Sequence, residues 1–280
     1  MEQQTRRALS RKAYEIRKHT LEMIRSANSG HIGGSFSIAE ILSVLYFQRM
    51  HTDPHQPRME SRDRLILSKG HCAPALYAAL AMRGYFPMED LSGFRRIDGY
   101  LSGHVEMTHV PGVDMSSGSL GQGLSVGVGM ALSAKTYGAD YTTFVILGDG
   151  EIEEGQVWEA AMSAAKYKLH RLVAIVDCNG LQLDSTTEEI MPMEPLGAKF
   201  EAFGWNVLRT DGHDVAKISE ALMHADANVG KPTVILADTV KGKGVSVFEN
   251  QLRFHGGRPT AEEYAVAFNE LNAKIAELEA

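Results

Sequence analysis

The chain is poor in cysteine and has no long apolar run. Only two of its 280 residues are cysteines, Cys72 and Cys178, which lie far apart and outside any Cys-x-x-Cys pattern. This argues against a disulfide framework and favours a reducing, cytoplasmic setting. No apolar stretch has the length of a membrane span, and the charged N-terminus lacks the apolar core of an export signal. We therefore expect a cytoplasmic globular protein.

The chain also lacks an excess of positive charge. It has 28 Lys and Arg against 35 Asp and Glu, a formal net charge of -7, and no basic stripe. This balance argues against nucleic acid as the main partner. Its length allows one large α/β domain or two small ones. Because we find no repeat, low-complexity tract or linker, we predict a single domain over residues 1–280.

Strand-like and helix-like segments alternate along the sequence. Short apolar runs predict strands at 64–67, 141–147, 172–176, 206–209 and 232–239. Helices are predicted between and around them, at 5–27, 37–47, 73–83, 123–134, 152–170, 196–203, 215–227 and from 260 onward. The first turns of the second and last of these helices resemble capping boxes, at Ser37–Glu40 and Thr260–Glu263. The alternation predicts an α/β fold with three layers, a mostly parallel sheet and helices on both faces.

Two of the apolar runs end in residues that suit a metal–phosphate site. Gly148-Asp149-Gly150 follows the run 141–147, and Asn179-Gly180 follows the run 172–176. A strand–helix–strand unit places its two strands parallel and adjacent, so Asp149 and Asn179 should meet at the carboxyl edge of the sheet. Each dipeptide alone is also a common turn. Their position at successive strand ends favours a site, because open α/β sheets bind ligands at this edge.

The side chains at this edge predict the kind of ligand. A carboxylate beside a carboxamide oxygen suits a hard divalent cation, and Mg²⁺ prefers few protein ligands together with phosphate oxygens. We therefore predict a metal-bridged diphosphate site at Asp149 and Asn179. Glu151 and Glu153 follow directly, and we interpret them as solvated charges that favour the start of a helix.

A glycine-rich loop, Gly118-Ser119-Leu120-Gly121-Gln122-Gly123, precedes an apolar helix. Glycines permit close backbone approach, and a helix N-terminus attracts anions. The spacing is one residue too long for a dinucleotide fingerprint, and the strand that should precede it is missing. Taken alone, these glycines favour tight helix packing over a ligand-binding loop.

Four histidines lie beside glycines in separate loops. They are His31, His71, His104 and His255. If these loops gather at one sheet edge, the imidazoles form a polar pocket that donates to phosphate or moves protons near pH 7. Their spacing does not match a zinc site. Cys72 follows His71 directly, and we interpret it as a small buried residue rather than a catalytic thiolate.

Together these residues resemble the transketolase family. The Gly148-Asp149-Gly150 and Asn179-Gly180 pair looks like the thiamine diphosphate motif of that family. The other motifs occur in the family's order from about Ala8 to about Tyr264: Ser29-Gly30-His31, Leu67-Ser68-Lys69-Gly70-His71, Ser102-Gly103-His104, the Gly118 loop and His255-Gly256. Several motifs in series make this match specific. The resemblance implies the thiamine diphosphate-binding fold.

The resemblance also implies roles for individual residues. It assigns the metal, Mg²⁺ or in its place Ca²⁺ or Mn²⁺, to the Asp149 carboxylate, the Asn179 side-chain oxygen and the Leu181 backbone carbonyl. It places Gly150, His71 and His255 against the diphosphate, and His31 and His104 beside the reacting carbon and the sugar hydroxyls. Cofactor contacts are also expected from Gly118, and from Leu120 and Leu183 around the thiamine rings. Glu154 matches a buried glutamate of the subunit interface.

The resemblance covers only the first part of a full transketolase. The pyrimidine-binding and C-terminal domains of the family have no counterpart here, and no residue matches the glutamate that activates the aminopyrimidine. We therefore expect an N-terminal transketolase subunit (EC 2.2.1.-) that acts with a separate C-terminal subunit, as a heterotetramer of two plus two chains. The pair would transfer a two-carbon ketol unit between sugar phosphates, as in pentose phosphate metabolism, or between specialised sugars or sulfosugars.

Two alternatives stay open at the level of sequence. Deoxyxylulose-phosphate synthase and the pyruvate dehydrogenase first component share the cofactor motif, although His104 and His255 favour a transketolase. The other alternative is a non-catalytic binding module that keeps the fold. The intact Asp149, Asn179 and four histidines weigh against it, because a decayed site need not retain them.

Overall fold

A computed structural model describes all residues, 1–280. Five strands form one sheet in the order β1-β2-β3-β5-β4: β1 (Arg64–Leu67), β2 (Thr143–Gly148), β3 (Leu172–Cys178), β4 (Asn206–Asp211) and β5 (Thr233–Asp238). All four pairings are parallel. Parallel neighbours need crossover connections, and each successive pair of strands is joined by a segment containing at least one helix. The predicted parallel α/β sheet is confirmed.

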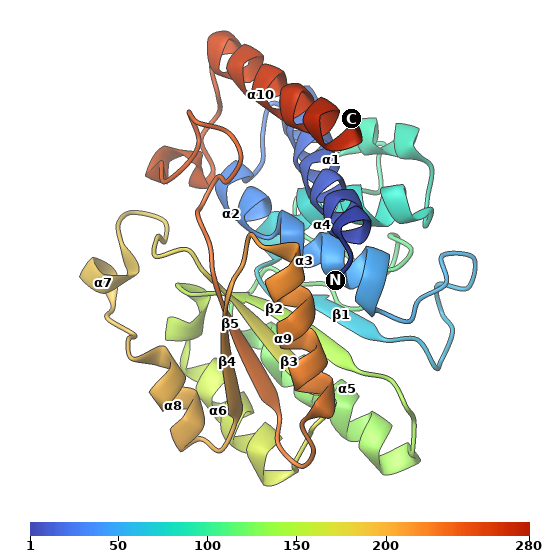
Figure 1. The fold of residues 1–280 in the computed structure, drawn as a ribbon, viewed down its shortest axis with the longest axis vertical. Helices are drawn as coiled ribbons and strands as arrows, with labels where there is room; N and C mark the ends of the chain where they lie inside the picture. The colour runs from blue at the N-terminus through green and yellow to red at the C-terminus, as the bar shows by residue number, and fades with distance from the viewer.

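Ten α-helices surround this sheet (Figure 1): α1 (Gln3–Ala27), α2 (Ile32–Ser37), α3 (Ala39–Val44), α4 (Ala73–Arg83), α5 (Gln122–Tyr137), α6 (Gly155–Lys166), α7 (Thr187–Ile190), α8 (Leu196–Ala202), α9 (Val215–Ala227) and α10 (Ala261–Glu279). Helical turns of other kinds lie at Leu45–Arg49, Gly70–Cys72, Met88–Gly93, Glu151–Glu153 and Leu252–His255. None of the helices combines the length and the hydropathy that crossing a lipid bilayer requires.

The sheet is buried on both faces because successive strand residues point to opposite sides. Phe144 and Ile146 pack into the larger core, which also contains residues of α1, α3, α4 and α9. Val145 and Leu147 pack into a second core with residues of α5, α6 and α8. Both predicted features, the three layers and the helices on both faces, are therefore present. Strands covered on both sides have continuous apolar sequences, and such runs predicted β2 and β3.

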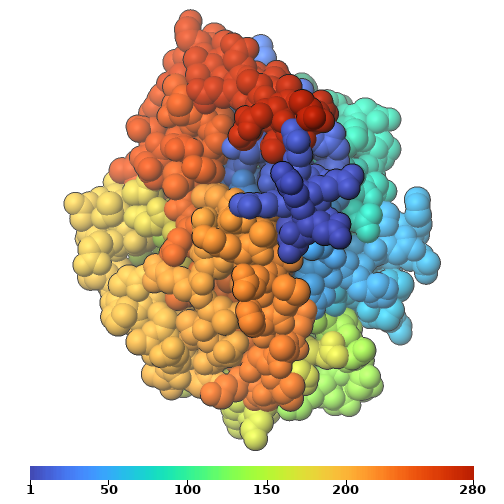
Figure 2. All heavy atoms as spheres, viewed as in Figure 1, coloured from blue at the N-terminus to red at the C-terminus, as the bar shows by residue number.

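The first and last helices lie side by side. α1 contacts α10 along its length, and the Arg7 side chain donates hydrogen bonds to the carbonyl oxygens of Glu277 (2.6 Å) and Leu278 (2.9 Å). Figure 2 shows the N-terminal residues lying against the C-terminal helix at the surface. The capping box predicted at the start of α10 is present, with Thr260 and Glu263 bonding each other's backbone.

The structure corrects two local predictions near the N-terminus. Residues 32–35, expected in a loop, begin the short helix α2. The capping box predicted at Ser37–Glu40 is wrong, since the Ser37 hydroxyl donates to Asp177 and Glu40 pairs with the buried Arg17. Both side chains have distant partners that a local sequence pattern cannot reveal.

The predicted helix 152–170 is also shorter in the structure. It consists of a 3₁₀ turn at Glu151–Glu153 followed by α6, which ends at Lys166. The crossover itself is as predicted, and it places the ends of β2 and β3 next to each other.

Candidate active site

A pocket of about 260 Å³ lies at the carboxyl edge of the sheet. It is walled by the segments that follow β1, β2, β3 and β5. The predicted site residues among its lining are His71, Leu120, Asp149, Gly150, Asn179, Leu181, Leu183 and His255. The topology therefore brings together motifs that span nearly two hundred residues of sequence.

The ends of β2 and β3 meet directly at this pocket. Gly148 pairs with Asp177, and the Asp149 N–H donates to the Asp177 carbonyl (3.2 Å). The Asp149 carboxylate accepts from the backbone N–H of Gly150 (3.0 Å) and of Gly180 (2.6 Å). Burial, and next the charge of Asp177, raise the pKa of Asp149 to about 6. A cation bound beside it would stabilise the ionised form of this carboxylate.

The other two predicted ligands lie on the same turn. Asn179 Oδ1 accepts from the Leu181 N–H (3.1 Å), and the Leu181 carbonyl accepts from Lys241 Nζ (3.1 Å). No group of three or more His, Cys, Asp or Glu side chains is arranged to hold a metal ion. The available donors are one carboxylate, one amide oxygen and one carbonyl. This oxygen set fits a hard cation that keeps phosphate or water oxygens in its remaining positions.

The four predicted histidines form one cluster. The ring centroid of His31 lies 5.1 Å from that of His71, 6.0 Å from His104 and 5.4 Å from His255, and His71 lies 5.1 Å from His255. The His31 Nδ1 atom is buried without a hydrogen-bond partner. Such an orphaned polar atom indicates a place for a ligand.

The histidines are held in their neutral form. Burial, and next the charge of Arg95, lower the pKa of His31 to about 4. Burial, and next Lys241, lower the pKa of His255 to about 3. Burial also lowers the pKa of His71 well below its usual range, and that of His104 as well. Neutral imidazoles have one donor and one acceptor nitrogen, so they can bond both hydroxyl and phosphate groups.

Four further predicted residues are Leu120, Leu183, Gly118 and Glu154, of which only the two leucines line the pocket. Leu120 and Leu183 line it and are large apolar side chains exposed to solvent, by 38% and 57%. A β-carbon on Gly118, whose φ is +153°, would lie 3.2 Å from the His104 ring, so only glycine lets the loop approach this closely. Glu154, expected at a subunit interface, is exposed in this single chain.

The structure adds two lysines to the predicted residues. Lys69 and Lys241 line the pocket, and both are almost completely buried. Lys69 is paired with Asp177. Lys241 Nζ instead contacts two carbonyls, of Leu181 (3.1 Å) and Gln182 (3.4 Å), and His255 Nδ1 (3.2 Å). Lys241 thus places a positive charge in the pocket without a carboxylate partner.

Arg95 is a further cation near the site that the sequence did not predict. It is exposed beside the histidine cluster, donates to the Ser29 hydroxyl (2.8 Å) and lies against Gly103. Neither lysine nor Arg95 lies in a sequence motif that by itself predicts a binding residue. The signal that could have found Lys69 is its place directly beside Gly70-His71.

The interpretation of Glu151 as a solvated charge is wrong. Its side chain is buried and accepts from the Ser68 hydroxyl and from the backbone N–H of Gly121 (3.0 Å) and Gly148 (3.0 Å). Burial raises its pKa. Glu151 therefore ties the glycine loop to the end of β2 from beneath the pocket. Glu153 is partly buried and accepts from Gln182 (2.6 Å).

The two cysteines are free, and neither is a reactive thiolate. Cys72 is fully buried, with its sulfur against Gly34, and burial raises its pKa to about 11. Burial also raises the pKa of Cys178 well above its usual range. The predicted packing role of Cys72 is confirmed by its burial.

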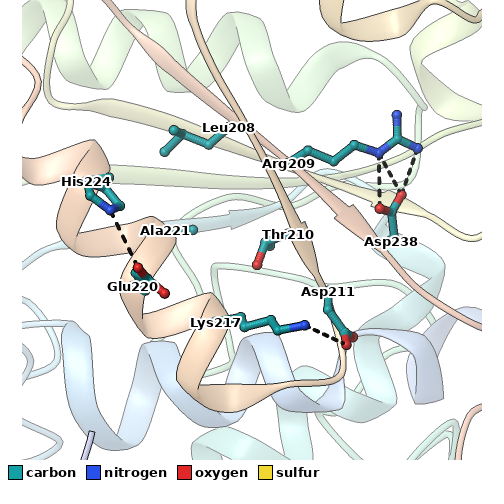
Figure 3. A pocket seen from close by; sticks show the side chains of 9 residues that line it. All are labelled: Leu208, Arg209, Thr210, Asp211, Lys217, Glu220, Ala221, His224 and Asp238. Atoms are coloured by element: carbon teal, nitrogen blue, oxygen red, sulfur yellow. Dashed lines mark hydrogen bonds and ion pairs between the residues drawn. The ribbon is translucent and has the colours of Figure 1, made fainter.

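Another groove, of about 480 Å³, lies between β4 and α9 (Figure 3). Its two cationic side chains are already paired, Arg209 with Asp238 (2.8 Å) and Lys217 with Asp211 (3.7 Å), and His224 lies 3.8 Å from Glu220. It contains none of the predicted site residues. We therefore place the candidate site at the pocket that contains Asp149, Asn179, His71 and His255.

Comparison with known proteins shows which family the chain is similar to. Residues 9–274 match the family model described as transketolase, thiamine diphosphate binding domain. The 6-deoxy-6-sulfo-D-fructose transketolase subunit of Clostridium sp. (strain MSTE9) is 49% identical over 94% of this chain and 96% of its own length. One of the subunits of the apulose-4-phosphate transketolase of Phocaeicola vulgatus is 44% identical, over 94% of this chain and 93% of its own length.

Solved structures show the same relationship. The transketolase of Campylobacter jejuni superimposes with a TM-score of 0.89 and 31% identity, over 96% of this chain and 45% of that one. This chain thus spans less than half the length of the solved transketolases, but nearly the whole length of the two subunits. Both the predicted fold and the predicted relationship are confirmed, and the chain belongs to the transketolase family.

Proposed function

We propose that this chain binds Mg²⁺ and the diphosphate of thiamine diphosphate and, together with a separate C-terminal subunit, transfers a two-carbon ketol unit from a ketose or ketose phosphate to an aldose or aldose phosphate. The observation that carries the proposal is the convergence of Asp149 and Asn179 with His71 and His255 in one pocket, where the ring contacts of His31 complete a cluster of four neutral histidines that includes His104. When bound, the cofactor supplies the electron sink for carbon–carbon cleavage, and the protein supplies position and electrostatics.

The metal end consists of Asp149, Asn179 and the Leu181 carbonyl. All three are oxygen donors on adjoining turns, and Asp149 already has its carboxylate fixed by two backbone N–H groups. Ca²⁺ or Mn²⁺ should replace Mg²⁺, because both accept oxygen ligands.

The diphosphate would meet further donors of the same pocket. His71 and His255 offer N–H groups, Lys241 adds a buried positive charge, and the Gly150 N–H, which donates to Asp149, would be shared with the diphosphate. Burial, and next the charge of Lys69, lower the pKa of Lys241. A diphosphate bound here would give Lys241 the anionic partner that it lacks. Charge-assisted hydrogen bonds of this kind are strong.

The sugar end consists of His31 and His104, with Arg95 beside them. Neutral imidazoles can accept a proton from a hydroxyl and return it to a carbonyl oxygen, which is general acid–base catalysis. The unpartnered Nδ1 of His31 is suited to such a hydrogen bond. Arg95 favours substrates with an anionic end. The relatives named above act on a sulfosugar and on a sugar phosphate, and either anion fits this cation.

The partner subunit should cover the mouth of the pocket. Leu120 and Leu183 are exposed there, where apolar side chains gain by contact with a second protein surface or with the thiamine rings. Glu154 lies exposed near Leu120, next to Gly121. We propose a heterotetramer of two plus two chains. Free thiols at Cys72 and Cys178 favour a cytoplasmic setting.

The proposal is tested by reconstitution. The purified chain is mixed with the candidate C-terminal subunit, thiamine diphosphate and Mg²⁺, and transfer of the ketol unit is followed with a panel of ketose donors and aldose acceptors. We expect activity from the pair and none from either chain alone. Activity of this chain alone would refute the divided enzyme. Cofactor binding by the pair without any ketol transfer would refute the reaction.

A further inference from the structure

A fully buried carboxylate lies behind the proposed metal site. Asp177 is the residue of β3 that pairs with Gly148 on β2 and with Ala237 on β5, and it is 0% exposed. It stands two residues before Asn179 but lines no part of the pocket. Nothing in the proposed reaction uses it directly.

Four donors surround this carboxylate. Oδ2 accepts from the Ser37 hydroxyl (2.6 Å), from Lys69 Nζ and from Asn179 Nδ2 (3.0 Å), and Oδ1 accepts from the Thr239 hydroxyl. Lys69 is 2% exposed, so the pair with Asp177 is a buried ion pair. An ionised carboxylate only accepts hydrogen bonds, so it satisfies all four donors at once.

The four donors come from four segments that also supply the pocket. Ser37 ends α2, which begins just after His31, and Lys69 stands two residues before His71. Thr239 follows β5 and stands two residues before Lys241. A buried ion pair contributes little net stability compared with apolar residues of the same size. The pair of Lys69 and Asp177 is therefore better explained by the way it holds the four donors in place than by a contribution to stability.

The contact with Asn179 has a direct chemical consequence. A carboxamide presents an oxygen and an NH₂ group that differ only in which way the group is turned. Because Asp177 Oδ2 accepts from Nδ2, the Asn179 oxygen faces the other way, where it accepts from the Leu181 N–H. The reverse orientation would aim two N–H donors at a cation.

We infer that Asp177 is a positioning residue that fixes the carboxamide of Asn179 with its oxygen toward the divalent cation, and that Lys69, its buried ion-pair partner, holds the Asp177 carboxylate in place. The inference rests on the proposed function, because it takes Asn179 as a metal ligand. Residues that orient metal ligands in this way typically change metal affinity by 10- to 100-fold when replaced.

Two matched double variants isolate the orienting contact. Lys69→Met/Asp177→Asn and Lys69→Met/Asp177→Leu both lack the ion pair, and at position 177 the first keeps an acceptor for Asn179 whereas the second offers none. The carbonyl of a carboxamide placed at position 177 can still accept from Asn179, while the Thr239 hydroxyl turns to accept from the new NH₂ group. The measurement is the Mg²⁺ concentration that gives half-maximal thiamine diphosphate binding, by calorimetry on the complex with the partner subunit. We expect this concentration to be about tenfold higher for the leucine variant.

The single variant Asp177→Asn guards against a leucine variant that does not fold. If orientation is what matters, its Mg²⁺ requirement should stay within about threefold of wild type, well short of the change expected when an orienting residue is lost. A tenfold rise for Asp177→Asn, or equal requirements for the two double variants, would overturn the inference. Wild-type complex that binds no thiamine diphosphate at any Mg²⁺ concentration would instead refute the proposed function.

Discussion

The two ends of the pocket are built in different ways. Asp149 and Asn179 extend two neighbouring strands, and backbone hydrogen bonds of those strand ends hold them directly. The histidines come from four separate loops and meet only through tertiary packing. An end fixed by the sheet suits a metal, which tolerates little variation in ligand geometry. An end made of loops can adapt to different sugars. If so, substitutions at the two ends should fail in different ways.

The largest expected effect is at the strand end. Asp149→Ala removes the only carboxylate among the proposed ligands, so affinity for thiamine diphosphate in the presence of Mg²⁺ should fall by more than about 100-fold, beyond the usual effect of an outer contact. Asp184→Ala, an exposed aspartate in the segment between β3 and α7, is the control and should bind normally. Calorimetry on the reconstituted pair checks both. Retained Mg²⁺-dependent binding in Asp149→Ala would contradict the metal assignment.

The histidine end should lose rate rather than cofactor. His31→Asn removes a proton-handling group at the sugar end, and turnover of the reconstituted pair should fall by about 100-fold or more. Binding of thiamine diphosphate should change little, because His31 is not expected to contact the diphosphate. His224→Asn, far away in the groove between β4 and α9, serves as control. Loss of cofactor binding in His31→Asn, with normal turnover at saturation, would reverse the roles given to the two ends.

Lys241 lies between the two ends and should show an intermediate effect. Lys241→Met keeps most of the apolar stem and removes the charge, which should lower thiamine diphosphate affinity by about tenfold, the usual loss for a charge-assisted hydrogen bond. Lys243→Met, a partly exposed neighbour paired with Glu249, should have no such effect. A titration of both variants with cofactor at saturating Mg²⁺ decides the matter, and equal affinities would remove Lys241 from the site.

The smallest effect concerns stability in acid. The pKa of His31 is 6.5 when unfolded and about 4 when folded, so the unfolded state binds more protons between these values. The contribution of neutral His31 to stability is therefore fully present above pH 6.5 and is lost as the pH falls toward 4. His31→Asn should reduce the fall in melting temperature between pH 7 and pH 4.5. The exposed His109→Asn is the control, and an unchanged acid slope in His31→Asn would show that His31 is not buried as described.

The strand end was predictable from sequence, and most of its supports were not. Gly148-Asp149-Gly150 and Asn179-Gly180 end continuous apolar runs, and one crossover fixes their relative position. The predictions for three supporting residues were wrong, because each has its partner far away in the chain. Glu151 accepts from Ser68 and Gly121, Ser37 donates to Asp177, and Glu40 pairs with Arg17. Local patterns explain a carboxylate by its neighbours in sequence, whereas burial is decided by residues that only the fold brings near.

The contact between α1 and α10 brings the first and last helices of the chain close together. Since Arg7 touches the backbone at Glu277 and Leu278, a short linker can join the two termini without disturbing either helix. New termini can then be placed in the exposed turn 228–231, which precedes β5 and lies at the edge of the sheet opposite the pocket. A chain rearranged in this way would keep every residue of the site, and it would carry a label or a surface tether on the side that no partner at the pocket mouth needs.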